Sequence, residues 1–313
     1  MRSIGIAGSC LFFAIVFAAA VMSAVPAAAQ TFDEGMKAYQ AENFATALKI
    51  FRTLADQGQA AAQVNLGIMY ANGEGVEQND AEAERWIRNA ADRGFAAAQV
   101  TLALMYDEGQ GVPQDHGKAA QWFRKAAAQG HVGAQLNLGL IYHAGRGVKR
   151  DDAEAAQWFR KAAEQGHTGA QVNLGILYAN GWGVKQDPAE AARWYRAAAD
   201  QGDVDAQYRL ARLYETGQGV QQDAAEAARW FREAAQRGHA DAQLILAIMY
   251  AEGQGVKRDD VLAYSWATFA ALNERLSDKA VPLRDKLTAR MTKEQITAAE
   301  QQLNEWRTRP GRQ

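Results

Sequence analysis

The sequence predicts an all-α fold, an α-solenoid built from antiparallel helix pairs in repeats of 36 residues. Three observations predict it. First, glutamine, tyrosine and tryptophan each recur six times at a spacing of 36 residues, and the glutamines are Gln63, Gln99, Gln135, Gln171, Gln207 and Gln243. Second, two glycines separated by one residue recur with the same spacing, and a valine follows each pair. Third, 48% of the 313 residues are apolar and 22% are charged, with five prolines and 28 glycines, which is typical of helices joined by glycine turns.

The N-terminal segment has the pattern of a secretory signal peptide. Arg2 precedes an apolar run from Ile4 to Val25, and a processing pattern that ends at Ala29 follows. We therefore expect residues 1–29 to be removed and the mature protein to be periplasmic or secreted. The alternative is an uncleaved membrane anchor, since ~20 apolar residues span a bilayer. The only cysteine, Cys10, lies in this run, so the stability of the mature chain is expected to come from packing without disulfides.

Residues 30–59 are expected to form a capping helix pair at the start of the array. Met36, Tyr39, Phe44 and Phe51 lie at helical spacings, but the glycine turn of the later repeats is missing. A terminal cap is required because each helix pair has an apolar face that only a neighbouring pair covers.

Six repeats then occupy residues 60–273, and their bounds are 60–95, 96–131, 132–167, 168–203, 204–239 and 240–273. In the first repeat, Ala62, Leu66 and Tyr70 lie at i, i+4 and i+8, so they form one stripe of a helix from about residue 60 to residue 71. We call this the first helix of a repeat. A small residue follows the leucine, Gly67 in this copy, and it is expected to allow close helix packing.

A Gly-x-Gly turn ends the first helix, and its first glycine suits a left-handed cap. Asn79 is expected to cap the second helix of the repeat, and Glu82 completes the spacing of a capping box. Aspartate takes the place of Asn79 in the other copies. The core that both helices build is predicted to contain Leu66, Tyr70, Trp86, Leu102, Tyr106, Trp122, Leu138, Tyr142, Trp158, Leu174, Tyr178, Trp194, Leu210, Tyr214, Trp230, Tyr250 and Trp266.

Residues 274–313 are expected to cap the other end with two helices and a loose tail. The second helix of the sixth repeat is more apolar than its counterparts, so a further element should cover it. One helix is predicted from Ser277 to about Ala289. Thr292 opens the last helix, in which Leu303 and Trp306 share one face with other apolar residues.

These residues resemble a known family, the Sel-one-like repeat, which is a relative of the tetratricopeptide repeat. Residues 171–184, Gln-Val-Asn-Leu-Gly-Ile-Leu-Tyr-Ala-Asn-Gly-Trp-Gly-Val, are one example of its pattern, and the match covers residues 60–273. The resemblance implies a right-handed superhelix whose first helices line a concave groove used for protein binding. It implies no catalysis. Some cysteine-rich members are linked to β-lactam binding or hydrolysis, but this chain lacks their paired cysteines.

No motif in the chain predicts a catalytic, metal or cofactor site. Three histidines, His131, His167 and His239, occupy one repeat position that Phe95 fills in another copy, so we expect a structural role for them. His116 and His143 are interpreted as isolated. The Gly-x-Gly turns lack the further residues of a dinucleotide-binding or P-loop motif. With 34 basic against 36 acidic residues, no basic surplus favours nucleic acid.

The predicted partner-binding surface starts with the residue that precedes the core leucine of each first helix. This position holds Asn65, Thr101, Asn137, Asn173 and Arg209 in successive copies. The amides are expected to face a peptide backbone, and the alternative is hydrogen bonding between repeats. More variable candidates lie one turn later or nearby, namely Asp107, His143, Arg212 and Glu215. Arg212 is expected to bind a carboxylate, or alternatively to pair with Glu215. Trp182, between two turn glycines, is expected to be an exposed contact or to pack on a neighbouring loop.

The sequence thus favours an exported, non-catalytic scaffold or adaptor that binds a protein or an extended peptide in the groove. One alternative is a periplasmic regulator that is docked on a membrane sensor protein. An enzyme that acts on β-lactams or the cell wall is the alternative from another class. Membrane contact is expected only through a partner or through an uncleaved anchor.

Overall fold

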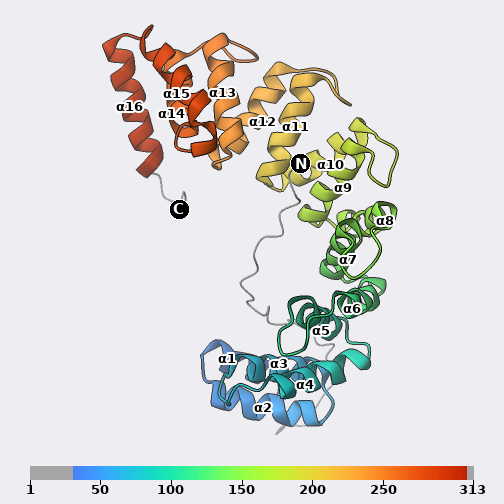
Figure 1. Cartoon of the computed structure of the whole chain (residues 1–313). Helices are drawn as coiled ribbons and strands as arrows, with labels where there is room; N and C mark the ends of the chain where they lie inside the picture. The colour runs from blue at the N-terminus through green and yellow to red at the C-terminus, as the bar shows by residue number, and fades with distance from the viewer. Residues whose placement is uncertain (1–30, 309–313) are drawn as a thin grey trace. The chain divides into compact units, whose positions relative to one another are not determined.

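The computed structural model describes residues 31–308, which contain sixteen α-helices and no strand (Figure 1). The predicted signal peptide and the last residues of the tail lie outside the described residues. The helices are α1 (Phe32–Gln40), α2 (Phe44–Asp56), α3 (Ala60–Asn72), α4 (Asp80–Asp92), α5 (Ala96–Glu108), α6 (His116–Ala128), α7 (Val132–Ala144), α8 (Asp152–Glu164), α9 (Thr168–Asn180), α10 (Pro188–Asp200), α11 (Val204–Thr216), α12 (Ala224–Gln236), α13 (Ala240–Glu252), α14 (Asp260–Ala270), α15 (Glu274–Thr288) and α16 (Lys293–Thr308). The all-helical fold and its repeats of 36 residues agree with an α-solenoid.

Each repeat is a pair of helices joined by the Gly-x-Gly turn. In the first repeat, Gly73 ends α3 with φ 72° and ψ 30°, the left-handed cap that the sequence predicts. The side chain of Asn79 then accepts a hydrogen bond from the backbone N–H of Glu82 at 3.0 Å, so it caps the start of α4. Aspartate caps the later second helices in the same way, as Asp115 does for α6.

The capping-box prediction for the second helices is wrong in one respect. In a capping box, the side chain of Glu82 would accept a hydrogen bond from the backbone N–H of Asn79. That N–H donates instead to the carbonyl of Tyr70 at 2.9 Å. Glu82 pairs instead with Arg85, one turn along the same helix, at 2.6 Å. Its counterpart Glu154 accepts a hydrogen bond from the indole Nε1 of Trp158 at 3.0 Å.

The helices form two compact units, of which the first ends at Trp158. At its start, α1 and α2 pack together and α2 packs on α3, so this pair covers the first repeat. Met36, Phe51 and Leu54 share one buried cluster with Leu66 and Tyr70 of the first repeat. This packing explains why the segment needs apolar residues at helical spacings although it lacks the glycine turn.

The second unit begins at Phe159, and it ends in two helices that cover the sixth repeat. Both α15 and α16 contact α14. The ring of Trp306 lies 4.5 Å from that of Trp266 and 5.7 Å from that of Phe269. Thr292 and Gln295 form reciprocal side-chain bonds to backbone N–H groups, a capping box at the start of α16. The apolar character of α14 is therefore matched by the helices that cover it.

Every predicted core residue is buried except Tyr214, which is half-buried. Its hydroxyl still accepts a hydrogen bond from Arg196, as the equivalent tyrosines do from equivalent arginines, so it remains part of the repeat framework. Between residues 31 and 308, no helix combines the length and the apolar character needed to cross a bilayer.

Candidate functional site

Five polar residues that precede the core leucines form a row along the first helices, and four of them bond to their own helix. The Nδ2 atom of Asn65 donates to the carbonyl of Ala61 at 2.9 Å, and Thr101 makes the same bond with its hydroxyl to Ala97 at 3.0 Å. Asn137 and Asn173 donate to the carbonyls of Gly133 and Gly169 at 2.9 and 2.7 Å. These bonds run four residues back within one helix, which is neither the groove contact nor the bond between repeats that the sequence suggested.

Exposure separates the members of this row. Asn65 and Thr101 are 2% and 7% exposed, so a partner has little access to either side chain. Asn137 and Asn173 are half-buried, and Arg209 is exposed. The role of the row in binding stays a prediction, and the accessible members are the last three.

Two histidine–aspartate pairs lie at the ends of first helices. The Nδ1 atom of His116, at the start of α6, lies 2.8 Å from Oδ1 of Asp107 on α5. In the next repeat, Nδ1 of His143 lies 2.7 Å from Oδ1 of Asp152. The interpretation of His116 and His143 as isolated is therefore wrong. The two pairs occupy equivalent positions with acid and base exchanged, because 107 and 143, like 116 and 152, differ by one repeat of 36 residues.

Arginines extend both pairs into small charged networks. Nη2 of Arg146, the residue between the turn glycines of the third repeat, lies 3.6 Å from Oδ2 of Asp107. Arg150 lies 2.7 Å from Oδ2 of Asp152. Burial by itself raises the pKa of Asp152, but the bonds from Arg150 and His143 outweigh it and hold that pKa below its usual value. These charges are neutralised within the protein.

The fifth repeat carries the remaining charged candidates. Nη1 of Arg212 lies 2.6 Å from Oε2 of Glu215, the internal pair that the sequence offered as the alternative to a bound carboxylate. Arg209 is exposed, and its guanidinium carbon lies 5.9 Å from the ring centre of Tyr195. Trp182, in the turn between α9 and α10, is 39% exposed. Arg209, Arg212 and Trp182 are all exposed, but Arg212 already pairs with Glu215.

The three equivalent histidines are helix caps. Nδ1 of His131 accepts a hydrogen bond from the backbone N–H of Ala134 at 3.2 Å, and His239 caps α13 through Ala242 at the same distance. Phe95 makes no side-chain cap, so the position tolerates a residue without one. Burial lowers the pKa of both His131 and His239, which keeps the ring neutral and able to accept the bond. Among the residues the structure describes, no three histidine, cysteine or acidic side chains gather as metal ligands.

Two ladders of contacts between repeats were missed in the sequence. Arg88 on α4 donates to the hydroxyl of Tyr106 on α5 at 2.6 Å, and arginines at the same repeat position reach the tyrosine 18 residues later in most copies. The buried glutamines donate from Nε2 to a carbonyl eight residues earlier, as Gln99 does to Ala91 at 3.1 Å. The arginine spacing of 36 residues was visible in the sequence, but it needed the fold to show its partner.

Comparisons with known proteins point to one repeat family. The model of the Sel1 repeat matches residues 60–95, 96–131, 132–167, 168–203, 204–239 and 240–274. A Sel1 repeat protein from Oxalobacter formigenes of known crystal structure is 36% identical, with a TM-score of 0.62 over 75% of this chain and 94% of that one. The protective antigen c5321 of uropathogenic Escherichia coli strains, which displays an SLR fold, is 28% identical, with a TM-score of 0.48 over 87% of this chain and 82% of that one. No curated protein is similar enough to match.

Proposed function

Because the chain belongs to the Sel1 repeat family, we propose that it is an exported, non-catalytic scaffold that binds a protein or an extended peptide. Sel1 repeat proteins are generally protein-interaction scaffolds, and this gives the class of function. The proposal adds the exported location, the absence of catalysis in this chain, and a binding surface on the first helices and the turns that follow them.

The observation that carries the proposal is a contrast between repeat positions. The leucine, tyrosine and tryptophan positions are nearly constant and almost all buried, so they serve the framework. The last two residues of each first helix change instead from copy to copy and are almost all half-buried or exposed, as Asp107, His143 and Glu215 illustrate. A fixed framework that carries variable surface residues is what recognition of a particular partner requires.

Pre-organisation supplies the physical basis for binding. Asn137 and Asn173 are each held by a bond to their own helix, while Oδ1 of each amide is not used by that bond. A partner that bonds to them orders fewer side chains than it would on a flexible loop, so less entropy is lost on association.

The surface is tested by replacing Asn137 and Asn173 with alanine together. The double variant is expected to capture less partner when it is cross-linked to proteins of the exported fraction and recovered. Its circular dichroism spectrum should stay unchanged. The matched control replaces Gln121 and Gln157, which are exposed amides on second helices separated by the same 36 residues. Equal capture by both double variants and the original chain would remove this surface from the proposal.

Export is tested by mass spectrometry of the protein recovered from its host. Cleavage after Ala29 predicts a mature chain that begins at Gln30 and appears in the periplasmic or secreted fraction. A chain that keeps residues 1–29 and sediments with membranes would instead support the anchor.

A further inference from the structure

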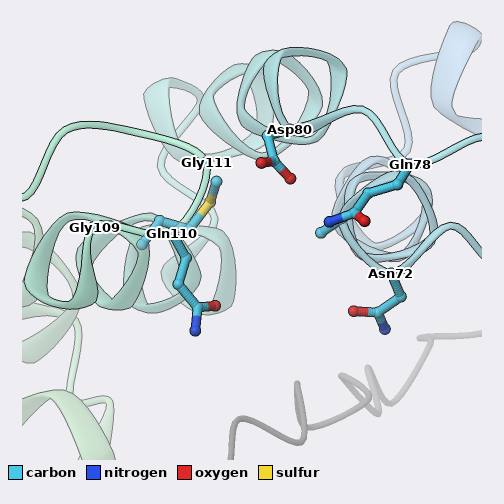
Figure 2. A pocket seen from close by; sticks show the side chains of 8 residues that line it. Asn72, Gln78, Asp80, Gly109, Gln110 and Gly111 are labelled. Atoms are coloured by element: carbon cyan, nitrogen blue, oxygen red, sulfur yellow. The ribbon is translucent and has the colours of Figure 1, made fainter.

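A polar pocket of about 530 Å³ lies between the turn that follows α3 and the turn that follows α5. Figure 2 shows the side chains of Asp80 and Gln78 pointing into this space, opposite Gln110 and the turn glycines. The polar and turn residues that line it are Asn72, Gln78, Asp80, Gly109, Gln110 and Gly111. The buried side chain of Met105 forms an apolar part of the wall.

Asp80 is the only acidic residue in this lining, and no arginine, lysine or histidine lines the pocket. Across residues 31–308, the Asp80 carboxylate has no hydrogen bond or ion pair. Gln78 also differs from its counterparts, because Gln114 bonds to the carbonyl of Asp107 at 2.9 Å whereas Gln78 makes no such bond. Its amide is therefore available to the pocket.

Equivalent aspartates in other repeats hold an arginine. Asp152 pairs with Arg150 at 2.7 Å, and Asp260 pairs with Arg258 at 3.3 Å. Asp260 also accepts a second arginine, Arg290, from outside its own repeat, at 2.6 Å. In the first repeat, Gln78 occupies the position of Arg150 and Arg258. The carboxylate of Asp80 is therefore present, but the arginine that would pair with it is absent.

The turn of the second repeat also lacks an arginine that the third repeat has. Between the second and third repeats, Arg146 reaches from its turn toward Asp107, with 3.6 Å between nitrogen and oxygen. Between the first and second repeats, Gln110 replaces that arginine and Ala71 replaces that aspartate. Compared with Arg146 and Asp107, Gln110 and Ala71 have less side-chain volume and no charge. The pocket lies in the space equivalent to the one that the larger, charged side chains occupy between the second and third repeats.

We propose that this pocket receives an arginine side chain of the bound protein or peptide, with its guanidinium on the Asp80 carboxylate. The amide oxygens of Gln78 and Gln110 supply further acceptors, and the methylene chain lies against Met105. Arginine suits the site better than lysine because its planar head donates five hydrogen bonds in fixed directions. This inference rests on the proposed function, for which it names one subsite and the chemistry of the group that enters it.

The direct test is a titration of the purified mature chain with N-acetyl-arginine amide. The side-chain amide signals of Gln78 and Gln110 in NMR spectra report binding. Saturable shifts are expected. N-acetyl-citrulline amide, a neutral molecule of nearly the same shape, should give no saturable shift. Asp80→Asn should weaken arginine binding by about fivefold, the upper range for an exposed ion pair. Equal responses to arginine and citrulline would overturn the inference.

A second variant tests the pocket without removing its acid. Gln110→Arg places a guanidinium where Arg146 lies in the next repeat, so it should pair with Asp80 and abolish binding of the arginine probe. The control is Gln218→Arg, which adds the same charge at the same turn position. There Gly219 lies against Pro188, which stands where the first repeat has Asp80. Loss of probe binding in both variants, or in neither, would contradict the proposal.

Partner capture separates this inference from the function on which it rests. If the original chain captures a partner and Gln110→Arg captures it equally well, the scaffold function stands and the arginine subsite is refuted. If the probe binds with the expected selectivity but the chain captures no protein, the pocket stands and the scaffold function fails.

Discussion

The second glycine of each turn has a role that its conformation alone does not explain. Gly75 has φ 71°, and a Cβ atom there would lie 2.8 Å from the backbone oxygen of Phe44 on α2. A Cβ on Gly111 would lie 3.0 Å from Cβ of Asp80 on α4. The turn of one repeat therefore lies against the start of the preceding second helix, and a side chain would separate the two.

Replacing Gly75 with alanine should lower the free energy of unfolding more than replacing Gly94, which has φ 90° and open space around it. Both changes force alanine into the left-handed region at a cost of ~1–2 kcal/mol. Only Gly75→Ala adds a backbone overlap. Urea unfolding followed by circular dichroism measures the difference, and equal losses would contradict the close approach.

The His131 cap predicts a pH dependence. Burial lowers the pKa of its imidazole, and the cap needs the neutral ring. The contribution to stability is therefore complete above the unfolded value of about 6.5 and is lost as the pH falls toward the lower folded pKa. His131→Asn keeps a capping acceptor that does not titrate, so it should lose less stability between neutral and mildly acidic pH than the original chain. Identical pH profiles in urea unfolding would exclude this role.

At the scale of the helix, large buried rings fill the interior of the repeats and polar ladders join one repeat to the next. Trp158 on α8 is 8% exposed, and its Nε1 is bonded to Glu154. The arginine–tyrosine contacts join most second helices to the next first helix. Because both kinds of contact recur in nearly every repeat, stability is expected to add up over neighbouring interfaces.

Trp158→Ala should reduce the free energy of unfolding by about 3–5 kcal/mol, because it empties a buried site in the array. Trp182→Ala is the matched control, since that ring is 39% exposed and should cost much less. Thermal and urea unfolding measure both variants. Similar losses from the two would show that the recurring tryptophans do not carry the framework.

At the scale of the molecule, the repeat of 36 residues is the unit that can be added or removed. Deleting residues 96–131 removes α5 and α6 together and leaves the order of first and second helices unchanged. The shortened chain should fold cooperatively with a lower melting temperature. Deleting residues 96–113 removes α5 alone, so two second helices follow each other, and the helical signal should fall sharply. Circular dichroism compares the two, and equal tolerance would contradict the stacking model.

Sequence reasoning located the framework well and the polar contacts less well. The stripe of Leu66 and Tyr70 and the left-handed Gly73 follow from local rules of helix periodicity and turn conformation. The contact of Asp107 with His116 does not, because it joins residues from two helices whose facing sides are set by packing. Asn65 was predicted to face a partner, and only the packed structure showed that it is buried.

The sequence by itself determined the helix pairs, the Gly-x-Gly turns, the family and the buried rings, because each depends on residue types at fixed spacing along one chain. The tertiary structure decided which polar groups are already neutralised and which are not. Asp152 and Asp260 are paired with arginines, whereas Asp80 faces a pocket without one. That difference depends on which side chains neighbouring helices and turns bring within a few ångströms of one another, a property of packing in three dimensions.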